Sequence, residues 1–314
     1  MRNYIIRRLL QLIPVLFGIS VAVFTVLRFI PGGFASGLLG IDATPELIAQ
    51  VNARYGLDQP LYQQYFLWIS GVLQGDFGVS FRSGADILPE ILSRFKVTAQ
   101  LALMAAVISW CIALPLGILA AVYRNSWIDR VVRVVALLGV SVPGFALSIL
   151  VILVLSLSFG YYPPLQYVGF FQDPAENMEL MFLPALILGT SMSGSVMRMT
   201  RSSVLEILRQ DFIKTVRAKG GSEGAAIFKH ALRNALIPII TLVGMQIGAL
   251  LGGAVVVEQI FSLPGLGLMT LSGISNYDYP VVQGCVLFIA FVYVMVNLVV
   301  DILYAYIDPR ISYT

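Results

Sequence analysis

Long apolar runs, broken by short polar segments, dominate the 314-residue sequence. A helix that crosses a membrane needs about 20 mainly apolar residues, because each residue adds about 1.5 Å across a hydrocarbon core about 30 Å thick. The pattern therefore predicts an all-α polytopic membrane protein, with one membrane domain over residues 1–314. The six segments that we expect to span the membrane are residues 9–30, 98–122, 131–159, 181–197, 237–260 and 281–304.

Composition supports this class, since 58% of the residues are hydrophobic and only 12% are charged. A typical soluble protein is about 25% charged, so a soluble globule is excluded. The basic start MRNYIIRRLL is typical of a signal peptide, but the apolar run that follows is longer than a signal peptide needs, which predicts a retained helix. Cys111 and Cys285 both lie in apolar runs and indicate neither a disulfide framework nor a metal site.

Basic residues indicate the orientation of the spans, because Lys and Arg gather on the cytoplasmic side of a membrane. If the N-terminus is cytoplasmic, only Arg28, Arg54, Arg82, Arg94 and Lys96 of the 20 basic residues fall outside, which leaves 15 inside. Six spans then place the C-terminus in the cytoplasm as well.

The first outer segment, residues 31–97, is long enough to form an external subdomain. Thr44 and Pro45 are suited to the start of a helix, as N-cap and first helical residue. Aromatic residues recur from Tyr62 to Trp68 at helical spacing. Two compatible interpretations remain, namely an amphipathic helix on the membrane or bundle, and a subdomain that docks a soluble partner.

A basic, amphipathic segment at residues 199–236 interrupts the apolar pattern. Apolar residues at helical spacing predict two helices with their apolar faces toward the bundle, one through Val204 and Phe212 and one through Phe228 and Ala235. Gly220 and Gly221 separate the helices, and Ser222 is a suitable N-cap for the second. Such a segment can bind anionic lipid headgroups, bind nucleic acid, or act as a lever that a cytoplasmic partner moves. The membrane context argues against nucleic acid.

Several motifs in this chain resemble the permeases of binding-protein-dependent ABC importers, in the dipeptide, oligopeptide and nickel subfamily, B-type subunit. The strongest is the segment DFIKTVRAKGGSEGAAIFKHALRNALIP, which resembles the cytoplasmic coupling loop of those permeases. Further matches, in order along the chain, are the first span, YGLDQPLYQQY, QGDFGVSF, VVEQIFSLPGLG, DYPVVQG and NLVVDILYAYIDPRI. The chain departs from the general signature at Lys214, Thr215 and Val216, where Glu-Ala-Ala is usual. Gly221 also stands where leucine is common.

The resemblance implies a type I permease fold, in a bacterial cytoplasmic (inner) membrane, that is one half of a heterodimeric pore. Its expected partners are a second permease subunit, two cytoplasmic ABC ATPases, an extracytoplasmic substrate-binding protein and membrane lipid. ATP and Mg²⁺ would be bound by the ATPases and not by this chain. The residues expected to contact the ATPase are Asp211, Lys214, Thr215, Arg217, Ala218, Lys219, Gly220, Ser222 and Glu223.

The resemblance also implies a substrate class, short peptides, with glutathione or a nickel–metallophore complex as alternatives. Polar or helix-breaking residues within the spans are candidates for the translocation path, because such residues in membranes are often functional. These are Ser141, Pro143, Glu258, Asn297 and Asp301. We expect Asn297 to hydrogen-bond Asp301, one turn away, and Glu258 to lie near the outer membrane interface.

Two other classes of function are disfavoured by what the sequence lacks. An ion-coupled secondary transporter is expected to carry acids at mid-membrane or paired broken helices, and neither is clear here. An enzyme is disfavoured because the chain has no G-x-x-x-x-G-K-[ST], H-E-x-x-H or G-x-S-x-G motif. The only histidine, His230, suits helix packing or capping better than catalysis or metal binding.

Overall fold

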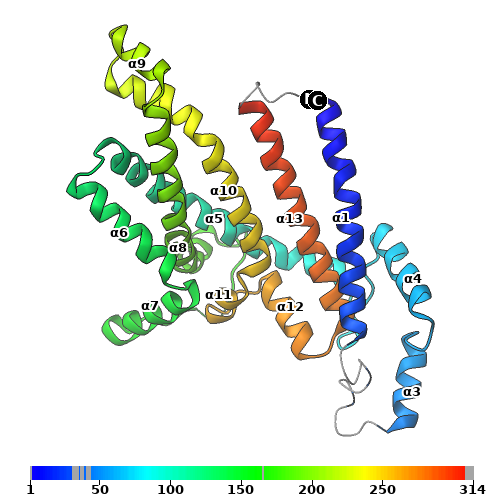
Figure 1. Ribbon diagram of the computed structural model, residues 1–314. Helices are drawn as coiled ribbons and strands as arrows, with labels where there is room; N and C mark the ends of the chain where they lie inside the picture. The colour runs from blue at the N-terminus through cyan, green and yellow to red at the C-terminus, as the bar shows by residue number, and fades with distance from the viewer. Residues whose placement is uncertain (1, 30–34, 36–38, 40–43, 165, 308–314) are drawn as a thin grey trace.

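The computed structural model describes residues 2–29, 35, 39, 44–164 and 166–307, and the chain is helical almost throughout these ranges (Figure 1). The expected all-α class is thereby confirmed. Most of residues 31–43, and the C-terminal segment with Arg310, lie outside the described residues. The elements in order are α1 (Arg2–Arg28), α3 (Pro45–Arg54), α4 (Leu61–Leu73), α5 (Ile87–Val122), α6 (Trp127–Ser141), α7 (Gly144–Phe159), α8 (Pro174–Leu208), α9 (Asp211–Ala218), the π-helix η2 (Ala225–Ala231), α10 (Leu232–Gly253), α11 (Val255–Ile260), α12 (Leu266–Ser275) and α13 (Tyr279–Ile307).

Five helices of the described chain are long and apolar enough to cross a membrane, and the bent pair α6–α7 would make a sixth span. Two of the predicted spans are much longer than expected. Helix α5 has 36 residues and begins at Ile87, inside the predicted outer segment. Helix α8 has 35 residues where the shortest span was expected, and it begins at Pro174 with Asp173 as N-cap, whose carboxylate accepts the backbone N–H groups of Ala175 and Glu176. Both helices continue through polar residues that a hydropathy criterion assigns to loops.

The third predicted span, residues 131–159, is not one continuous helix. Helices α6 and α7 meet at 98°. Val142 has extended backbone angles (φ −91°, ψ 117°), the conformation that a following proline favours, so α6 ends at Ser141 and α7 starts after Pro143. By contrast, Pro184 lies inside α8 without ending it.

The fifth predicted span, residues 237–260, is divided too. Helix α10 ends at Gly253, and residues 255–260 form the separate short helix α11. The short apolar helix α12 then leads into α13, which corresponds to the sixth predicted span.

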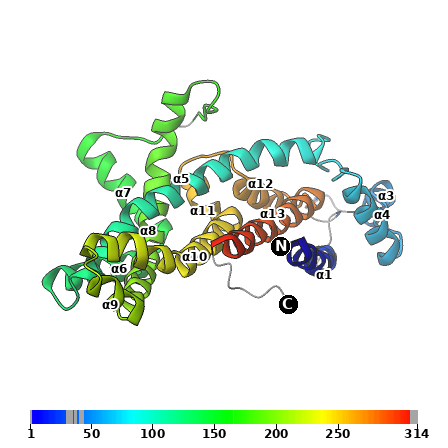
Figure 2. The ribbon, with the colours of Figure 1, turned by 90° about the horizontal axis from the view of Figure 1, so that it is seen from above.

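The core of the bundle is the packing of α5 along α8, the most extensive contact between helices in the described chain. Figure 2 shows α5 stretched across the whole bundle, with α8 beside its C-terminal half. Gly189 permits the close approach of the two helices, because a Cβ atom there would lie 2.7 Å from the carbonyl oxygen of Ala105. Small residues serve this purpose at helix contacts in membranes, where apolar side chains gain little by leaving lipid.

The outer segment packs onto the bundle through α4. The ring of Tyr65 meets that of Phe24 on α1 at a centroid distance of 5.4 Å, and its hydroxyl lies 2.8 Å from Ser20 Oγ. Nearby, Arg28 Nε donates to Gln64 Oε1 at 2.8 Å. Thr44 is the N-cap of α3, as predicted, and its side chain accepts the N–H of Leu47. Whether this segment also docks a soluble partner stays a prediction.

Helix α9 lies at one end of the molecule, together with the start of α1 and the end of α13, and α12 lies at the opposite end (Figure 1). Arg8 of α1 and Asp301 of α13 form an ion pair at 3.1 Å near the α9 end. The partner of Asp301 is therefore Arg8, where we had expected Asn297.

Candidate functional site

The basic segment forms an exposed helical hairpin at the end of α8. After a break at Arg209 and Gln210, the eight-residue helix α9 follows. Ile213 is fully buried against Ala226 and Ala231 of η2, with Ile207 and Leu208 of α8 at the edge of this small cluster. The short helix is thus fastened to both neighbouring elements by one apolar face.

The turn after α9 is a Schellman motif, which closes the helix through two backbone hydrogen bonds. Gly220 N–H donates to the Arg217 carbonyl oxygen at 2.9 Å, and Gly221 N–H donates to that of Val216 at 3.0 Å. Gly220 has φ +81°, which a residue with a side chain adopts only at a cost. At Gly221 a Cβ atom would lie 2.9 Å from the Val216 carbonyl oxygen. The second glycine therefore allows a tight turn to close.

Two ion pairs lie on the exposed face of this hairpin. Lys214 Nζ lies 2.8 Å from Asp211 Oδ1, and this hydrogen bond lowers the pKa of the Asp211 carboxyl group. Arg217 binds Glu223 across the glycine turn through Nε to Oε1 at 2.8 Å and Nη2 to Oε2 at 3.0 Å. Lys214 and Arg217 are thus exposed, as predicted, but each is engaged by an acid of the hairpin itself.

All nine residues expected to contact an ATPase lie on the exposed surface of α9 and the turn that follows it. Ser222 caps the next helix as predicted, since its Oγ accepts the N–H of Ala225 at 3.2 Å. Their contact with an ATPase stays a prediction, but the structure brings them together on one small surface.

The two predicted helices of this segment are partly wrong. The stripe from Val204 to Phe212 is divided between α8 and α9, and Phe212 is exposed. The second helix begins as a π-helix, whose i→i+5 hydrogen bonds do not keep the 3.6-residue spacing on which the prediction relied. Consequently Phe228, expected to face the bundle, is 63% exposed.

A buried ion pair between α6 and α8 lies close to the hairpin. The sequence did not predict it. Asp129, at the start of α6, is 0% exposed. Its carboxylate accepts hydrogen bonds from Arg201 Nε at 2.6 Å and from Arg201 Nη2 at 2.9 Å. Arg201 lies two turns before the end of α8, and the backbone N–H of Asn125 also donates to Asp129. The only sequence signal for this ion pair was that Asp129 is a single acid in a basic segment. Its partner Arg201 is 72 positions away, so the sequence did not identify it.

The five residues proposed for a translocation path do not converge in the structure. Ser141 and Pro143 are exposed at the α6–α7 bend. Glu258 is 0% exposed, enclosed by protein between α5, α11 and α12, and its expected place near the outer membrane interface stays a prediction. Asn297 and Asp301 lie on α13, with Asp301 at the α9 end.

Family models match nearly the whole chain. Residues 1–102 match the N-terminal model of the binding-protein-dependent transport system membrane components, and residues 113–313 match the binding-protein-dependent transport system inner membrane component.

Relatives and a solved structure point the same way. The chain is 43% identical to the glutathione transport system permease protein GsiC of Escherichia coli K12 and 42% identical to that of Shigella flexneri serotype 5b, with full coverage of both chains. The fold is similar to that of the MetNI methionine ABC transporter in an inward-facing conformation, with a TM-score of 0.56 at 18% identity over 69% of this chain and 96% of the other.

These matches decide between the two classes of transporter that the sequence left open. An importer permease, and not an ion-coupled carrier or an ATP-hydrolysing subunit, accounts for the matched models, the relatives and the fold. The chain belongs to the inner-membrane permease components of binding-protein-dependent ABC importers.

Proposed function

We propose that this chain is one half of a heterodimeric pore that imports short peptides, and that α9 is the element through which a cytoplasmic ATPase moves it. In this proposal two ATPase subunits bind ATP and Mg²⁺, and an extracytoplasmic binding protein delivers the substrate. The chain itself supplies the path and the mechanical contact.

The geometry of α9 is the observation that supports the coupling role best. A lever must transmit force without bending, and α9 is held by a buried face, a closed glycine turn and an ion pair across that turn. Its exposed face carries small residues, Ala218 and Gly220, beside charged ones, which permits close approach to a partner. A surface that only met lipid headgroups would need none of this rigidity.

Among short peptides, glutathione is the first candidate for the substrate. The relatives named above are glutathione permeases, and they are similar to this chain along its entire length. Other di- and oligopeptides remain within the proposed class, and a nickel–metallophore complex is the alternative outside it.

The substrate is tested by reconstituting the chain with its partner subunits and binding protein in liposomes. We expect glutathione to raise the rate of ATP hydrolysis and to accumulate inside, whereas a nickel–histidine complex does neither. Stimulation by the nickel complex alone would contradict the peptide assignment. Dependence of uptake on a proton gradient rather than on ATP would contradict the coupling role.

A further inference from the structure

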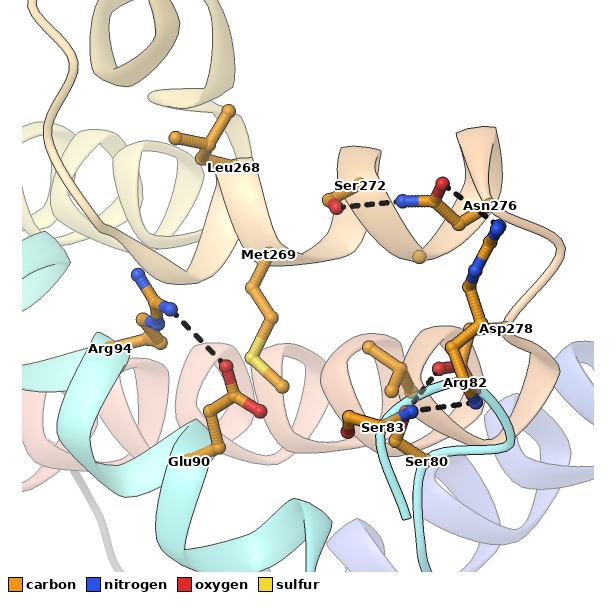
Figure 3. Close-up of a pocket in the computed structure, with 12 residues that line it drawn as sticks. Ser80, Arg82, Ser83, Glu90, Arg94, Leu268, Met269, Ser272, Asn276 and Asp278 are labelled. Carbon is orange, nitrogen blue, oxygen red and sulfur yellow. Dashed lines mark hydrogen bonds and ion pairs between the residues drawn. The ribbon is translucent and has the colours of Figure 1, made fainter. Parts of the chain in front are cut away.

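A polar pocket of about 340 Å³ lies at the end of the molecule opposite α9 (Figures 1 and 3). Its walls are α12, the first turns of α5 and the turn at residues 80–83. Asp278, which is almost fully buried, accepts hydrogen bonds from Ser80 Oγ at 2.5 Å and from the N–H of Phe81 at 3.1 Å. These bonds fasten the turn to the residues just before α13, so the pocket is built from segments far apart in the sequence.

The α12 wall is held in place by the buried carboxylate of Glu258. Thr98 Oγ1 of α5 and the N–H of Leu268 donate to this carboxylate at 2.6 and 2.8 Å. The same Thr98 oxygen accepts the N–H of Leu266, at the first residue of α12. Because α12 is tied to α5 in this way, the pocket between the two helices is formed before any ligand arrives.

Charged groups occupy both ends of the pocket, as Figure 3 shows. At one end Glu90 and Arg94 of α5 form an ion pair at 3.2 Å, with side chains 38% and 37% exposed. At the other end Arg82 donates to Asn276 Oδ1 at 3.2 Å. The side chain of Met269 lies between the two ends. The pocket thus presents an acid beside a cation, then the apolar side chain of Met269, then a second cation next to the buried Asp278, whose carboxylate is already hydrogen-bonded by Ser80 and Phe81.

This arrangement is complementary to a small zwitterion. A guanidinium group has five donors, so Arg82 and Arg94 each retain donors for a carboxylate beyond the contacts described. Glu90 can accept an ammonium group. A γ-glutamyl peptide carries an ammonium and a carboxylate on one carbon atom and a further carboxylate at its far end, so its charges are complementary in sign to Glu90, Arg94 and Arg82.

We propose that this pocket is a receiving site for the transported peptide, with the α-amino-acid group at Glu90 and Arg94 and the distal carboxylate at Arg82. The proposal rests on the proposed function and adds a specificity site within the permease itself. Binding is weak, because the ligand competes with ion pairs that already exist and are partly screened by solvent. A weak site suits a permease, which has to release what it accepts.

The decisive variant exchanges the two charges on α5, Glu90→Arg with Arg94→Glu. This double variant keeps an ion pair at the same positions, so a purely structural role would survive the exchange. A receiving site would present the wrong charge to each group of the peptide. Arg82→Gln tests the other end, and Arg54→Gln, an exposed cation of α3 that does not line the pocket, is the matched control.

Peptide binding is measured separately from transport, in the assembled transporter. The chain carries Ser272→Cys, which places a thiol at the pocket, and Cys111→Ser, which removes the exposed native thiol. Ser272 is exposed and lines the pocket. We expect the thiol-free peptide γ-glutamylalanylglycine to slow maleimide labelling of this cysteine. Arg82→Gln should need about tenfold more peptide for the same protection, the effect of losing one charge-assisted hydrogen bond. The exchange variant, which reverses two charges, should need at least as much more. Arg54→Gln should match the parent.

Transport of glutathione and ATP hydrolysis are then measured in liposomes. We expect uptake at low substrate to fall about tenfold in both pocket variants, while stimulation of hydrolysis by the binding protein stays unchanged. Unchanged protection in the exchange variant would overturn the proposal. If the binding protein no longer stimulated ATP hydrolysis in the pocket variants, the proposal would also be overturned, because the pocket would then be a contact site for the binding protein. Protection without any glutathione transport by the parent would leave the pocket assignment standing and contradict the proposed function.

Discussion

Replacing Lys214 and Arg217 together by glutamate is expected to reduce substrate uptake by about tenfold or more, with insertion into the membrane and assembly with the ATPases intact. Both side chains lie on the exposed face of α9, where the proposed partner binds. Reversed charges at a protein interface oppose the groups they formerly attracted, at a cost of several kcal/mol. Both rates are measured in liposomes. The amount of substrate taken up per ATP hydrolysed should fall.

Lys214 and Arg217 also form ion pairs inside the hairpin. A further variant must therefore separate the loss of these ion pairs from the loss of the contact with the ATPase. The exchange Arg217→Glu with Glu223→Arg keeps an ion pair across the turn and reverses only its direction. We expect it to be stably folded and still poorly coupled. Normal uptake by this variant would mean that Arg217 only holds the turn.

The matched control for charge is Lys229→Glu with Arg233→Glu. These exposed cations lie on η2 and α10, close to α9 but outside the proposed contact surface. We expect nearly normal coupling. If both double variants lost uptake equally, the segment would act through its overall positive charge, as lipid-headgroup binding predicts.

Removing the carboxylate of Asp129 is expected to destabilise the chain by about 3 kcal/mol, since Asp129→Ala leaves Arg201 without its buried partner. Asp129 is fully buried, and both of its oxygens receive Arg201. The ion pair joins α6 to the part of α8 that carries α9, so we also expect weaker coupling. Thermal unfolding of the purified chain in detergent measures the first effect.

Two further variants separate two contributions to the loss of stability. One is the cost of leaving the Arg201 charge without a partner, and the other is the loss of the contact between the side chains. Arg133→Gln removes the other cation near Asp129, at 3.3 Å, but its side chain is 52% exposed, so we expect a change below about 1 kcal/mol. Asp129→Leu with Arg201→Met replaces the pair by apolar side chains and should be more stable than Asp129→Ala alone. A loss in Asp129→Ala no larger than that in Arg133→Gln would refute this role for the pair.

Local signals in the sequence predicted the segments that depend on local chemistry. The paired glycines located the turn after α9, and Ser222 and Thr44 were found as caps, because these features need only neighbouring residues. The apolar runs located the long helices for the same reason, although not their ends or the breaks after α6 and α10. The nine residues expected to contact an ATPase lie close together because the motif that suggested them falls almost entirely within one hairpin, and their role stays a prediction.

Features that depend on tertiary contacts were not predictable in this way. Pro143 ends a helix and Pro184 does not, although both stand in apolar runs, so a proline in such a run does not by itself locate a helix end. Glu258 and Asp129 have their partners 160 and 72 positions away, so their burial left no local pattern. The pocket beside α12 was not predicted because its walls come from three separate segments, the turn at residues 80–83, α5 and α12.

Contact between α9 and an ATPase is the central claim, and photochemical cross-linking tests it most directly. A photoreactive maleimide is attached to Lys219→Cys, an exposed residue at the end of α9, in a chain with Cys111→Ser; Cys285 is buried. The same probe at Arg54→Cys, in the outer segment, is the control. We predict that illumination of the assembled transporter joins Lys219→Cys to an ATPase subunit, that ATP changes the yield, and that Arg54→Cys does not react with it. Cross-links from position 219 to lipid alone, with the ATPases bound, would contradict the account.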